Sequence, residues 1–390
     1  MDLPFPNHPP RPAFPPGFLW ALEASFATGP FRPGPPPVPW DRLDALLRSA
    51  GLWPAIATRL ARPDLRDLLD PAGTALARRY RQAHAEEALR ALFTAGLVTR
   101  IARQQDIPLV FLKGTALHLS GRAPPCGRPL ADVDVLVPAA AARRLAARME
   151  AAGFRRIGRS LSRHHLDPLG HPAGIPVEIH LHLPGCSPPE DPDRPLRFED
   201  LGPAGRTEAV RIGGLDTRVP APDVLAAHLV VHGLLDHGLR PDRYPPWRWV
   251  TDLACLRDDG AAARWTAWVP GPSAPRWGRA VESLLDHLRH PPPGESPLPG
   301  DPGARRLFLH LSAGTLDPGY RRALRARQWW PWPPPIDLRE GLVKALHRLR
   351  HPDRPGDDPG PSSRLDRMRT AVRALLEFYL APGDSADRRR

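Results

Sequence analysis

Residues Phe111–Pro138 decide the fold, and they read FLKGTALHLSGRAPPCGRPLADVDVLVP. Two short, apolar and β-prone runs, Pro108–Leu112 and Val133–Val137, predict strands. The first run ends at Lys113-Gly114, and Thr115–Ser120 can then begin a helix. The predicted order is therefore a strand, a glycine turn, a helix and a second strand.

The second predicted strand carries two acidic residues. Asp132 and Asp134 stand two positions apart, so both carboxylates project from the same face of the strand. Two such carboxylates repel each other unless a cation lies between them. Mg²⁺ binds one or two carboxylates together with substrate phosphates, and this spacing favours such a site. Replacing either aspartate by asparagine is expected to abolish the chemistry and, by removing the repulsion, to stabilise the metal-free protein.

The turn between the first strand and the helix has the features of a phosphate-binding loop. Lys113, Gly114 and Thr115 connect the two elements, so backbone N–H groups and the helix dipole would point toward an anion. Glycine lets a phosphate come close, and threonine offers a hydroxyl group. An ordinary strand-to-helix turn has the same pattern, so this prediction depends on the neighbouring aspartates.

A third acidic residue lies on a later predicted strand, residues 177–182 (VEIHLH). Apolar side chains alternate there with Glu178, His180 and His182, which places the three polar side chains on one face. Two-metal phosphoryl transfer uses a further carboxylate, and Glu178 is expected to supply it, with the histidines supporting the ligands. The alternative is a mononuclear zinc hydrolase that uses Glu178, His180 and His182 and does not need the aspartates.

The whole chain predicts an α+β fold with a mixed sheet. Residues 1–39 are rich in proline and predict a disordered or extended arm. Residues 40–106 have helical apolar spacing, residues 107–219 alternate strands with helices, and residues 220–390 are helical again with proline-rich linkers. The elements predicted after Val137 are a helix and three strands, Ala139–Ala152, Phe154–Ile157, Arg163–Leu166 and Ile175–Leu183.

Composition argues against several classes of protein. The net charge is +12, but the basic residues are almost all arginines spread along predicted helices, so nucleic-acid binding is not expected. No apolar run approaches the roughly 20 residues of a membrane span, and the N-terminus has no signal-peptide pattern, so we expect a cytoplasmic protein. The three cysteines, Cys126, Cys186 and Cys255, form no pair typical of zinc or disulfide frameworks.

As a set, these segments resemble a family of uncharacterised bacterial nucleotidyltransferases in the DNA polymerase β superfamily. That family has a strand ending in LKG, an arginine, a DxD strand, a helix ending in glycine and a strand reading E-x-H. The corresponding residues here are Leu112-Lys113-Gly114, Arg128, Asp132-Val133-Asp134, Gly153-Phe154 and Glu178-Ile179-His180. The helical part that resembles Pro222–Gly260 has matches at His228, His232, His237, Trp249 and Asp252-Leu253. The resemblance extends from Trp40 to Gly260.

The resemblance implies a polymerase β-type nucleotidyltransferase core over residues 107–219, flanked by helical regions. Two Mg²⁺ ions would be held by Asp132, Asp134 and Glu178, which are also the implied catalytic residues. The residues implied to contact the nucleotide are Lys113, Gly114, Thr115 and Arg128. Lys113 or Arg128 would offset charge on the leaving pyrophosphate.

Two departures from the family pattern affect the phosphate loop more than the metal site. The usual Gly-Ser or Gly-Gly turn is Gly114-Thr115, and the β-branch of threonine restricts the turn. The connection to Asp132 is also long and contains Pro124-Pro125. The phosphate geometry is therefore less defined than the carboxylate geometry.

The predicted function is transfer of a nucleoside monophosphate from an NTP, expected to be ATP, to an unidentified acceptor. The acceptor is a small molecule, a peptide or a protein. One alternative is a non-catalytic nucleotide- or partner-binding protein with the same fold. Another is an RNA-directed nucleotidyltransferase, which would bind RNA with a steep salt dependence. The sequence does not give the oligomeric state.

Overall fold

The architecture comes from a computed structural model, in which every described residue belongs to one compact unit. None of the described helices has the length and apolarity that a membrane crossing requires. The described residues are 14–15, 17–26, 36–60, 70–123, 128–158, 160, 164–202, 205–233, 247–256, 260, 264–271, 274–291 and 298–312.

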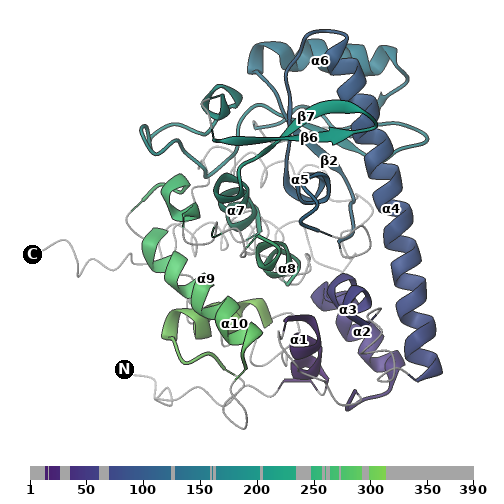
Figure 1. The fold of residues 1–390 in the computed structure, drawn as a ribbon, viewed down its shortest axis with the longest axis vertical. Coiled ribbons are helices and arrows are strands. Elements are labelled where there is room, and N and C mark those ends of the chain that lie inside the picture. Colours follow the sequence, from purple (N-terminus) through teal and green to yellow (C-terminus); the bar gives the residue numbers. More distant parts are fainter. Residues whose placement is uncertain are drawn as a thin grey trace, which may run out of the picture. The chain divides into compact units, whose positions relative to one another are not determined.

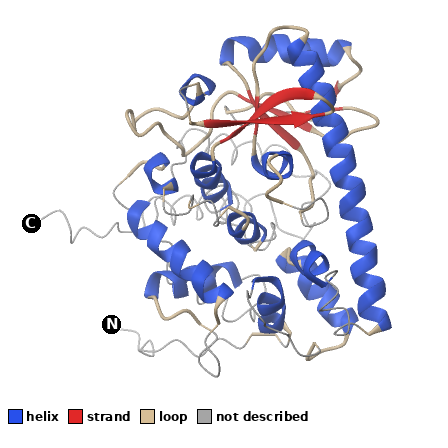
Figure 2. Cartoon of the chain, in the orientation of Figure 1, coloured by secondary structure: helices blue, strands red, loops and turns tan. Residues whose placement is uncertain are grey.

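The centre of the protein is one mixed seven-stranded sheet with the order β3-β4-β5-β2-β1-β7-β6. Figure 2 shows this sheet in red among the helices. The strands are β1 (Val110–Phe111), β2 (Val133–Leu136), β3 (Arg155–Arg156), β4 (Leu169–Gly170), β5 (Val177–His180), β6 (Thr207–Ile212) and β7 (Leu215–Pro220).

The middle strands set the register that matters for function. Strand β2 pairs in parallel with β5, so that Asp134 lies opposite Glu178. It pairs antiparallel with β1, where Phe111 lies opposite Val135. Because side chains alternate between the faces of a sheet, Asp134 and Glu178 lie side by side on one face.

A β-hairpin that the sequence analysis did not predict completes the sheet. Strands β6 and β7 pair antiparallel from Thr207–Pro220 to Ile212–Leu215. The two residues between them, Gly213 and Gly214, have φ angles of 55° and 79°. Two consecutive positive φ angles are what a two-residue type I′ hairpin turn requires. Strand β7 then joins β1 in parallel.

Helices α4, α5, α6 and α7 contact the sheet, and the long helix α4 also contacts α3 and α6 (Figure 1). Helix α4 has 33 residues, and its Asp70 N-cap accepts a hydrogen bond from the Gly73 N–H at 2.7 Å. Its length is roughly 50 Å at the standard rise per residue. The helices are α1 (Phe18–Phe26), α2 (Trp40–Ala50), α3 (Trp53–Leu60), α4 (Pro71–Arg103), α5 (Lys113–Leu119), α6 (Ala139–Ala151), α7 (Pro222–Val230), α8 (Arg248–Ala254), α9 (Ala274–Arg289) and α10 (Pro302–Ser312), with short 3₁₀ helices at Phe198–Leu201 and Trp265–Trp268.

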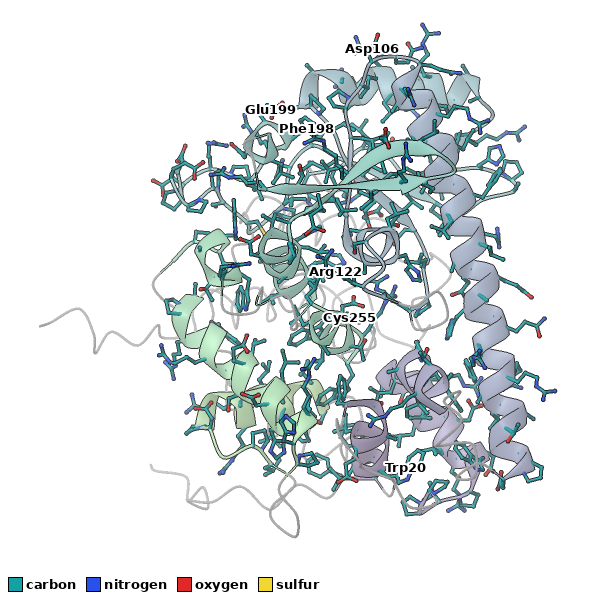
Figure 3. The ribbon with its side chains drawn as sticks, viewed as in Figure 1. Trp20, Asp106, Arg122, Phe198, Glu199 and Cys255 are labelled. Carbon is teal, nitrogen blue, oxygen red and sulfur yellow. The ribbon has the colours of Figure 1, made fainter. Side chains whose placement is uncertain are left out.

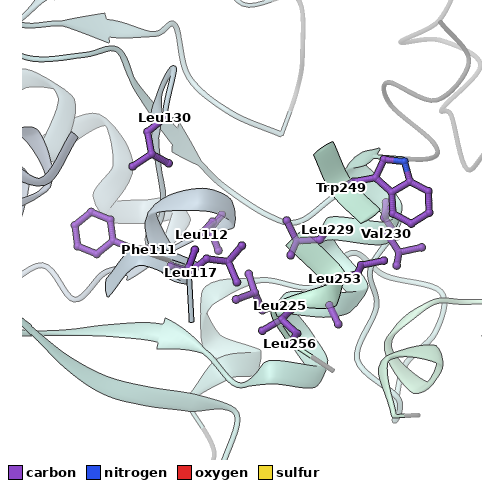
Figure 4. Packing of buried hydrophobic residues seen from close by; sticks show 14 of the residues in the cluster. Phe111, Leu112, Leu117, Leu130, Leu225, Leu229, Val230, Trp249, Leu253 and Leu256 are labelled. Carbon is purple, nitrogen blue, oxygen red and sulfur yellow. The ribbon is translucent and has the colours of Figure 1, made fainter. Parts of the chain in front are cut away.

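Helix α5 is fixed between the sheet and the C-terminal helices. Leu112 and Leu117 face a group of apolar side chains from α7 and α8 that includes Leu225 and Leu253 (Figure 4). On its other side, Arg122 (labelled in Figure 3) forms a bidentate ion pair with Glu208 of β6, at 2.7 and 3.0 Å. The segment that begins at Lys113 is therefore held by both apolar packing and an ion pair.

The predicted α+β class is confirmed, and helix α6 agrees with the predicted helix Ala139–Ala152 to within one residue. The predicted strands are shorter in the structure than in the sequence analysis. Of the segment Arg163–Leu166, residue 163 lies outside the described residues, and His165 forms only an isolated bridge with His180. The division of the chain into four regions stays a prediction.

The prediction of a disordered or extended arm over residues 1–39 is wrong for Phe18–Phe26, which form helix α1. Phe18 is fully buried, and its ring packs edge-on against Trp247 with centroids 6.0 Å apart. The proline content dominated the prediction, whereas the sequence FLWALEASF between the prolines is apolar enough to join the core. The rest of the predicted arm, apart from residues 14–15, 17 and 36–39, lies outside the described residues.

Candidate active site

Asp134 is the centre of a buried polar group on the sheet. Its Oδ1 atom accepts a hydrogen bond from the Lys113 ammonium at 2.8 Å and another from His180 Nε2, also at 2.8 Å. Asp134 and His180 are each 1% exposed, and Lys113 is 7% exposed. Strands β2 and β5 position the aspartate and the histidine, and the turn after β1 positions the lysine.

Glu178 completes this group, which we call the carboxylate cluster (Lys113, Asp134, Glu178 and His180). Its Oε2 atom lies 3.7 Å from His180 Nε2. One ligand atom from each of Asp134, Glu178 and His180 lies within 4.8 Å of the others, an arrangement that could hold a metal ion. The glutamate is the most exposed of the three, with 26% of its side chain accessible, so the cluster opens to solvent on that side.

The charges in the carboxylate cluster shift one another's pKa values. Burial favours a raised pKa for Asp134, but the Lys113 ammonium and the hydrogen bond from His180 outweigh it and hold that pKa well below its usual range. Burial favours a lowered pKa for Lys113 and His180, yet the surrounding carboxylates raise both. Burial favours a raised pKa for Glu178, but the nearby His180 imidazole and Lys113 ammonium outweigh it and lower that pKa. Both cluster carboxylates therefore stay ionised at neutral pH.

Asp132 behaves differently from Asp134. The charge of Asp134 and, after it, burial raise the pKa of Asp132, while Lys113 and Arg248 partly offset the shift. Asp132 does not belong to the group of three ligand atoms within 4.8 Å. The structure thus brings Asp134, Glu178 and His180 together, with Asp132 beside them as an acidic neighbour of elevated proton affinity.

Lys113 has a backbone conformation that L-residues rarely adopt, with φ of 49°. A non-glycine residue in this left-handed region carries strain of roughly 1–3 kcal/mol that its surroundings must offset. The strained backbone turns the chain from β1 into α5. The ammonium bond to buried Asp134 supplies the compensating interaction and fixes the lysine inside the carboxylate cluster.

Gly114 is required by a close contact with Arg128. A methyl group at Gly114 would overlap the guanidinium of Arg128 and press on Leu130. The sequence analysis attributed the glycine to the approach of a phosphate, but a protein side chain fills the space above its Cα. Any phosphate near this turn would therefore meet the Arg128 guanidinium rather than the bare glycine backbone.

Arg128 belongs to a second charged group, the arginine cluster (Arg128, Arg248 and Asp252). Arg128 Nε donates to Asp252 Oδ1 at 2.7 Å, and both side chains are buried. Arg248, one turn before Asp252 on α8, donates from Nη2 to the Pro129 carbonyl at 2.7 Å. Burial and, after it, the charge of Arg128 lower the pKa of Arg248 to about 10.

The remaining predicted site residues, Thr115 and His182, make fewer defined contacts. Thr115 is 1% exposed, and its hydroxyl has no hydrogen-bond partner among the described residues. His182 is half-buried beyond the end of β5, with its ring 6.1 Å from that of His164. It does not join the group that could hold a metal, whose third member in the described part of the chain is Asp134 instead.

Polar atoms without partners mark the same region. Among the described residues, His180 Nδ1, His228 Nδ1, Thr115 Oγ1 and Arg248 Nε are buried without a hydrogen-bond partner. They lie on strand β5 and on helices α5, α7 and α8, and α7 contacts both of the other helices. Burial and, after it, the charge of Lys113 lower the pKa of His228 well below its usual range, so this imidazole is neutral. Atoms of this kind also occur elsewhere among the described residues, for example at Thr58 and Thr217.

A separate pocket of about 530 Å³ adjoins the arginine cluster, because its lining residue His118 lies 3.2 Å, through Nε2, from the Arg128 carbonyl oxygen. Its lining comes from α4, the end of α5 and the β6–β7 turn, and it includes Leu92, Gly96, His118 and Ile212. No residue of the carboxylate or arginine cluster lines it. The pocket has no convergent set of carboxylates, so it is not where phosphoryl chemistry is expected.

The sequence analysis gave no role to Arg248 and noted Asp252 only as part of a family pattern. Both are separated from Arg128 by more than 100 positions, and local periodicity carries no information about such a pair. One signal was available, because WRWVTDLA places an arginine and an aspartate four residues apart in an otherwise apolar helix. The predicted match His237 lies outside the described residues.

Comparison with known proteins shows the family of this chain. No curated protein matches the chain. A solved structure, that of the antibiotic-resistance factor ANT(2'')-Ia, is similar at 14% sequence identity and a TM-score of 0.34, over 50% of this chain and 95% of that chain. The family model described as uncharacterised nucleotidyltransferase matches residues 36–291, which include every residue of the carboxylate and arginine clusters. The chain therefore belongs to the uncharacterised nucleotidyltransferase family, and it is a transferase.

Proposed function

We propose that this nucleotidyltransferase uses divalent cations to move a nucleoside monophosphate from an NTP to an acceptor that is a small molecule, a peptide or a protein. The core would be of the polymerase β type, and the NTP would be ATP. The observation that carries the proposal is the parallel pairing of β2 with β5, which sets Asp134 beside Glu178 on one face of the sheet. The family match over residues 36–291 supports the same reaction class.

The residues of the carboxylate cluster fit a divalent cation. Two ionised carboxylates and an imidazole are within ligand distance of one another, and the Lys113 ammonium now neutralises part of their charge. Oxygen-rich sites of this kind suit Mg²⁺ or Mn²⁺, and the imidazole also suits Mn²⁺. Asp134 and Glu178 would hold one ion, and Asp132 would contribute to a second beside it. When bound, the ions would supply positive charge against the phosphate oxygens and lower the pKa of the attacking group.

The chain's own residues would mainly bind and orient the reactants. Asp134 is already fixed by two hydrogen bonds, so its free oxygen has a defined direction. Glu178 is the most accessible cluster carboxylate and would align the attacking oxygen of the acceptor. Arg128 and the Thr115 hydroxyl would contact the phosphates. Catalysis of phosphoryl transfer depends largely on such positioning and charge stabilisation.

The alternative zinc hydrolase is less favoured by the geometry. It needs Glu178, His180 and His182 around one ion, whereas the ligand group in the described part of the chain contains Asp134 in place of His182. The RNA-directed alternative has no described surface feature that favours it.

The proposal is tested with ATP, GTP, CTP and UTP labelled at either the α- or the γ-phosphate, each incubated with Mg²⁺, the protein and a cell extract. We expect label to be transferred from the α-position only, with release of pyrophosphate and complete loss in EDTA. Ribonuclease and protease treatment of the product then distinguishes RNA, protein and small-molecule acceptors. Transfer of the γ-label instead, or transfer that survives in an Asp132→Asn/Asp134→Asn double variant, would contradict the proposal.

A further inference from the structure

The two arginines of the arginine cluster lie side by side. Arg128 Nη1 and Arg248 Nη2 both donate to the Pro129 carbonyl, at 3.3 and 2.7 Å. Both guanidinium groups therefore converge on one oxygen of the segment that leads to Asp132. Two like charges at such a distance repel each other unless anions lie between or beside them.

Asp132 and Glu87 act on Arg248 only through longer-range electrostatics, as does Asp252. Asp252 bonds Arg128, and no carboxylate oxygen of the described residues lies within 4.0 Å of the Arg248 guanidinium. Arg248 Nε is also buried without a hydrogen-bond partner among those residues. Burial of a charged donor without a partner is costly, so the fold keeps an arginine that is satisfied only when something else binds.

Lys113 is not free to do the same task. Its ammonium is within the carboxylate cluster, bonded to Asp134 at 2.8 Å and near Glu178 and Asp132. The sequence analysis assigned the phosphate charge to Lys113 or Arg128, and the structure leaves Arg248 with the least compensated positive charge of the three.

We propose that Arg248, together with Arg128, forms an anion site for the phosphate chain of the nucleotide. This inference rests on the proposed function and names a binding residue for it. A planar guanidinium matches phosphate oxygens with parallel N–H donors, and two of them can hold adjacent phosphates. Asp132 interacts electrostatically with Arg248 of the anion site and with Asp134 of the carboxylate cluster. A cation held by carboxylates on one side and phosphates held by arginines on the other is the arrangement that a metal-bound polyphosphate requires.

The test measures binding rather than turnover. Sodium tripolyphosphate, pyrophosphate, inorganic phosphate and succinate are titrated by calorimetry in EDTA into the wild type, Arg248→Gln, Arg248→Lys and the control Arg90→Gln. Arg90 is a matched control because, like Arg248, it donates a hydrogen bond from Nη2 to a backbone carbonyl, here that of Gly174 at 2.6 Å. It belongs to neither cluster. We expect tripolyphosphate to bind tightest, with at least a tenfold loss in Arg248→Gln, a smaller loss in Arg248→Lys and no change in Arg90→Gln.

Several results would overturn the inference. An unchanged affinity for tripolyphosphate in Arg248→Gln would overturn it. Binding of succinate that depends on Arg248, without binding of polyphosphates, would also overturn it, because the site would then recognise a carboxylate of the acceptor. If Arg248→Gln does not fold, Arg248→Lys decides, because a compact ammonium should retain folding but lose several-fold in affinity. Wild-type turnover of labelled NTP is measured in parallel. If polyphosphate binding depends on Arg248 but no NTP is turned over, the proposed function is refuted and the anion site stands. If NTP is turned over but polyphosphate binding does not depend on Arg248, the anion site is refuted and the proposed function stands.

Discussion

The carboxylate cluster and the arginine cluster are neighbours with opposite ratios of carboxylates to permanently charged cations. In the first, two ionised carboxylates face one ammonium and one imidazole. In the second, two guanidinium groups have one directly bonded carboxylate, that of Asp252. Each arrangement alone is unfavourable in a buried site, since unpaired charges lose their hydration. The pair together is complementary to a ligand that is cationic at one end and anionic at the other.

Asp132 shows how the two clusters are coupled. The charge of Asp134 and, after it, burial raise its pKa, and the charges of Lys113 and Arg248 oppose that shift. It therefore interacts with both clusters while belonging to neither ion pair. The two aspartates of the DxD motif, which the sequence treats as equivalent, occupy different electrostatic positions, and variants at the two positions should separate them.

The largest expected effect is at Asp134. Asp134→Asn leaves the buried Lys113 ammonium without its partner, and breaking a buried pair in this way costs about 3–5 kcal/mol. Asp132→Asn instead removes repulsion from Asp134 and should leave stability unchanged or raised. Urea unfolding in EDTA measures both. The sequence analysis expected stabilisation from either change, and the Lys113–Asp134 pair is the reason that the expectation now holds for Asp132 alone.

In nucleotidyl transfer, by contrast, the two variants should agree, each falling below a hundredth of wild-type activity. The double variant Lys113→Met/Asp134→Asn serves as a control, because it removes both charges and should regain part of the stability without regaining activity. Equal destabilisation by Asp132→Asn and Asp134→Asn would mean that the two aspartates are equivalent after all.

A smaller effect is expected from Gly114→Ala, which disturbs the arginine cluster and leaves the carboxylates in place. The added methyl group displaces the Arg128 guanidinium, which is held by Asp252. We expect a loss of about 1–3 kcal/mol in stability, as for other overpacked buried sites. The apparent KM for the NTP should rise at least tenfold, while divalent-cation binding, followed by calorimetry, stays within twofold of wild type. Loss of cation binding in this variant would show that the two clusters cannot be disturbed separately.

The carboxylate cluster was predictable from sequence because it is built from local patterns. Alternation in VDVL and in VEIH fixes the face on which Asp134, Glu178 and His180 lie, and any parallel pairing of these strands brings them together. The family resemblance also implied Asp134 and Glu178, but with Asp132 in place of His180 as the third ligand. The position of Lys113 inside the cluster did not follow, since it depends on one residue with a positive φ angle.

The arginine cluster could not be predicted in the same way. Arg128 and Asp252 are 124 positions apart, and their pairing depends on how α8 packs beside the segment before β2. Helix α1 and the β6–β7 hairpin show the two other limits of the sequence analysis. In helix α1, an apolar segment lies between proline-rich stretches, and the prolines determined the prediction. In the β6–β7 hairpin, Gly213-Gly214 is a turn signal between alternating residues that the prediction did not use.

The smallest expected effect concerns the protonation of His180. Burial favours a lowered pKa for His180, but its hydrogen bond to Asp134 and the nearby Glu178 carboxylate outweigh burial and raise that pKa above the unfolded value of about 6.5. The stabilisation is therefore complete below about pH 6.5 and is lost as the pH rises through the folded pKa, at no more than about 1.4 kcal/mol per pH unit for one proton. The lowered pKa of His228 changes the free energy of unfolding only below about pH 6.5, and the lowered pKa of Asp134 changes it only at still lower pH. Neither group therefore contributes above pH 6.5. Unfolding free energies in EDTA from pH 6.5 to 9 should decline more steeply for wild type than for His180→Gln. Parallel curves would mean that His180 is neutral in the folded protein, and the carboxylate cluster would then carry a net negative charge for a cation to offset.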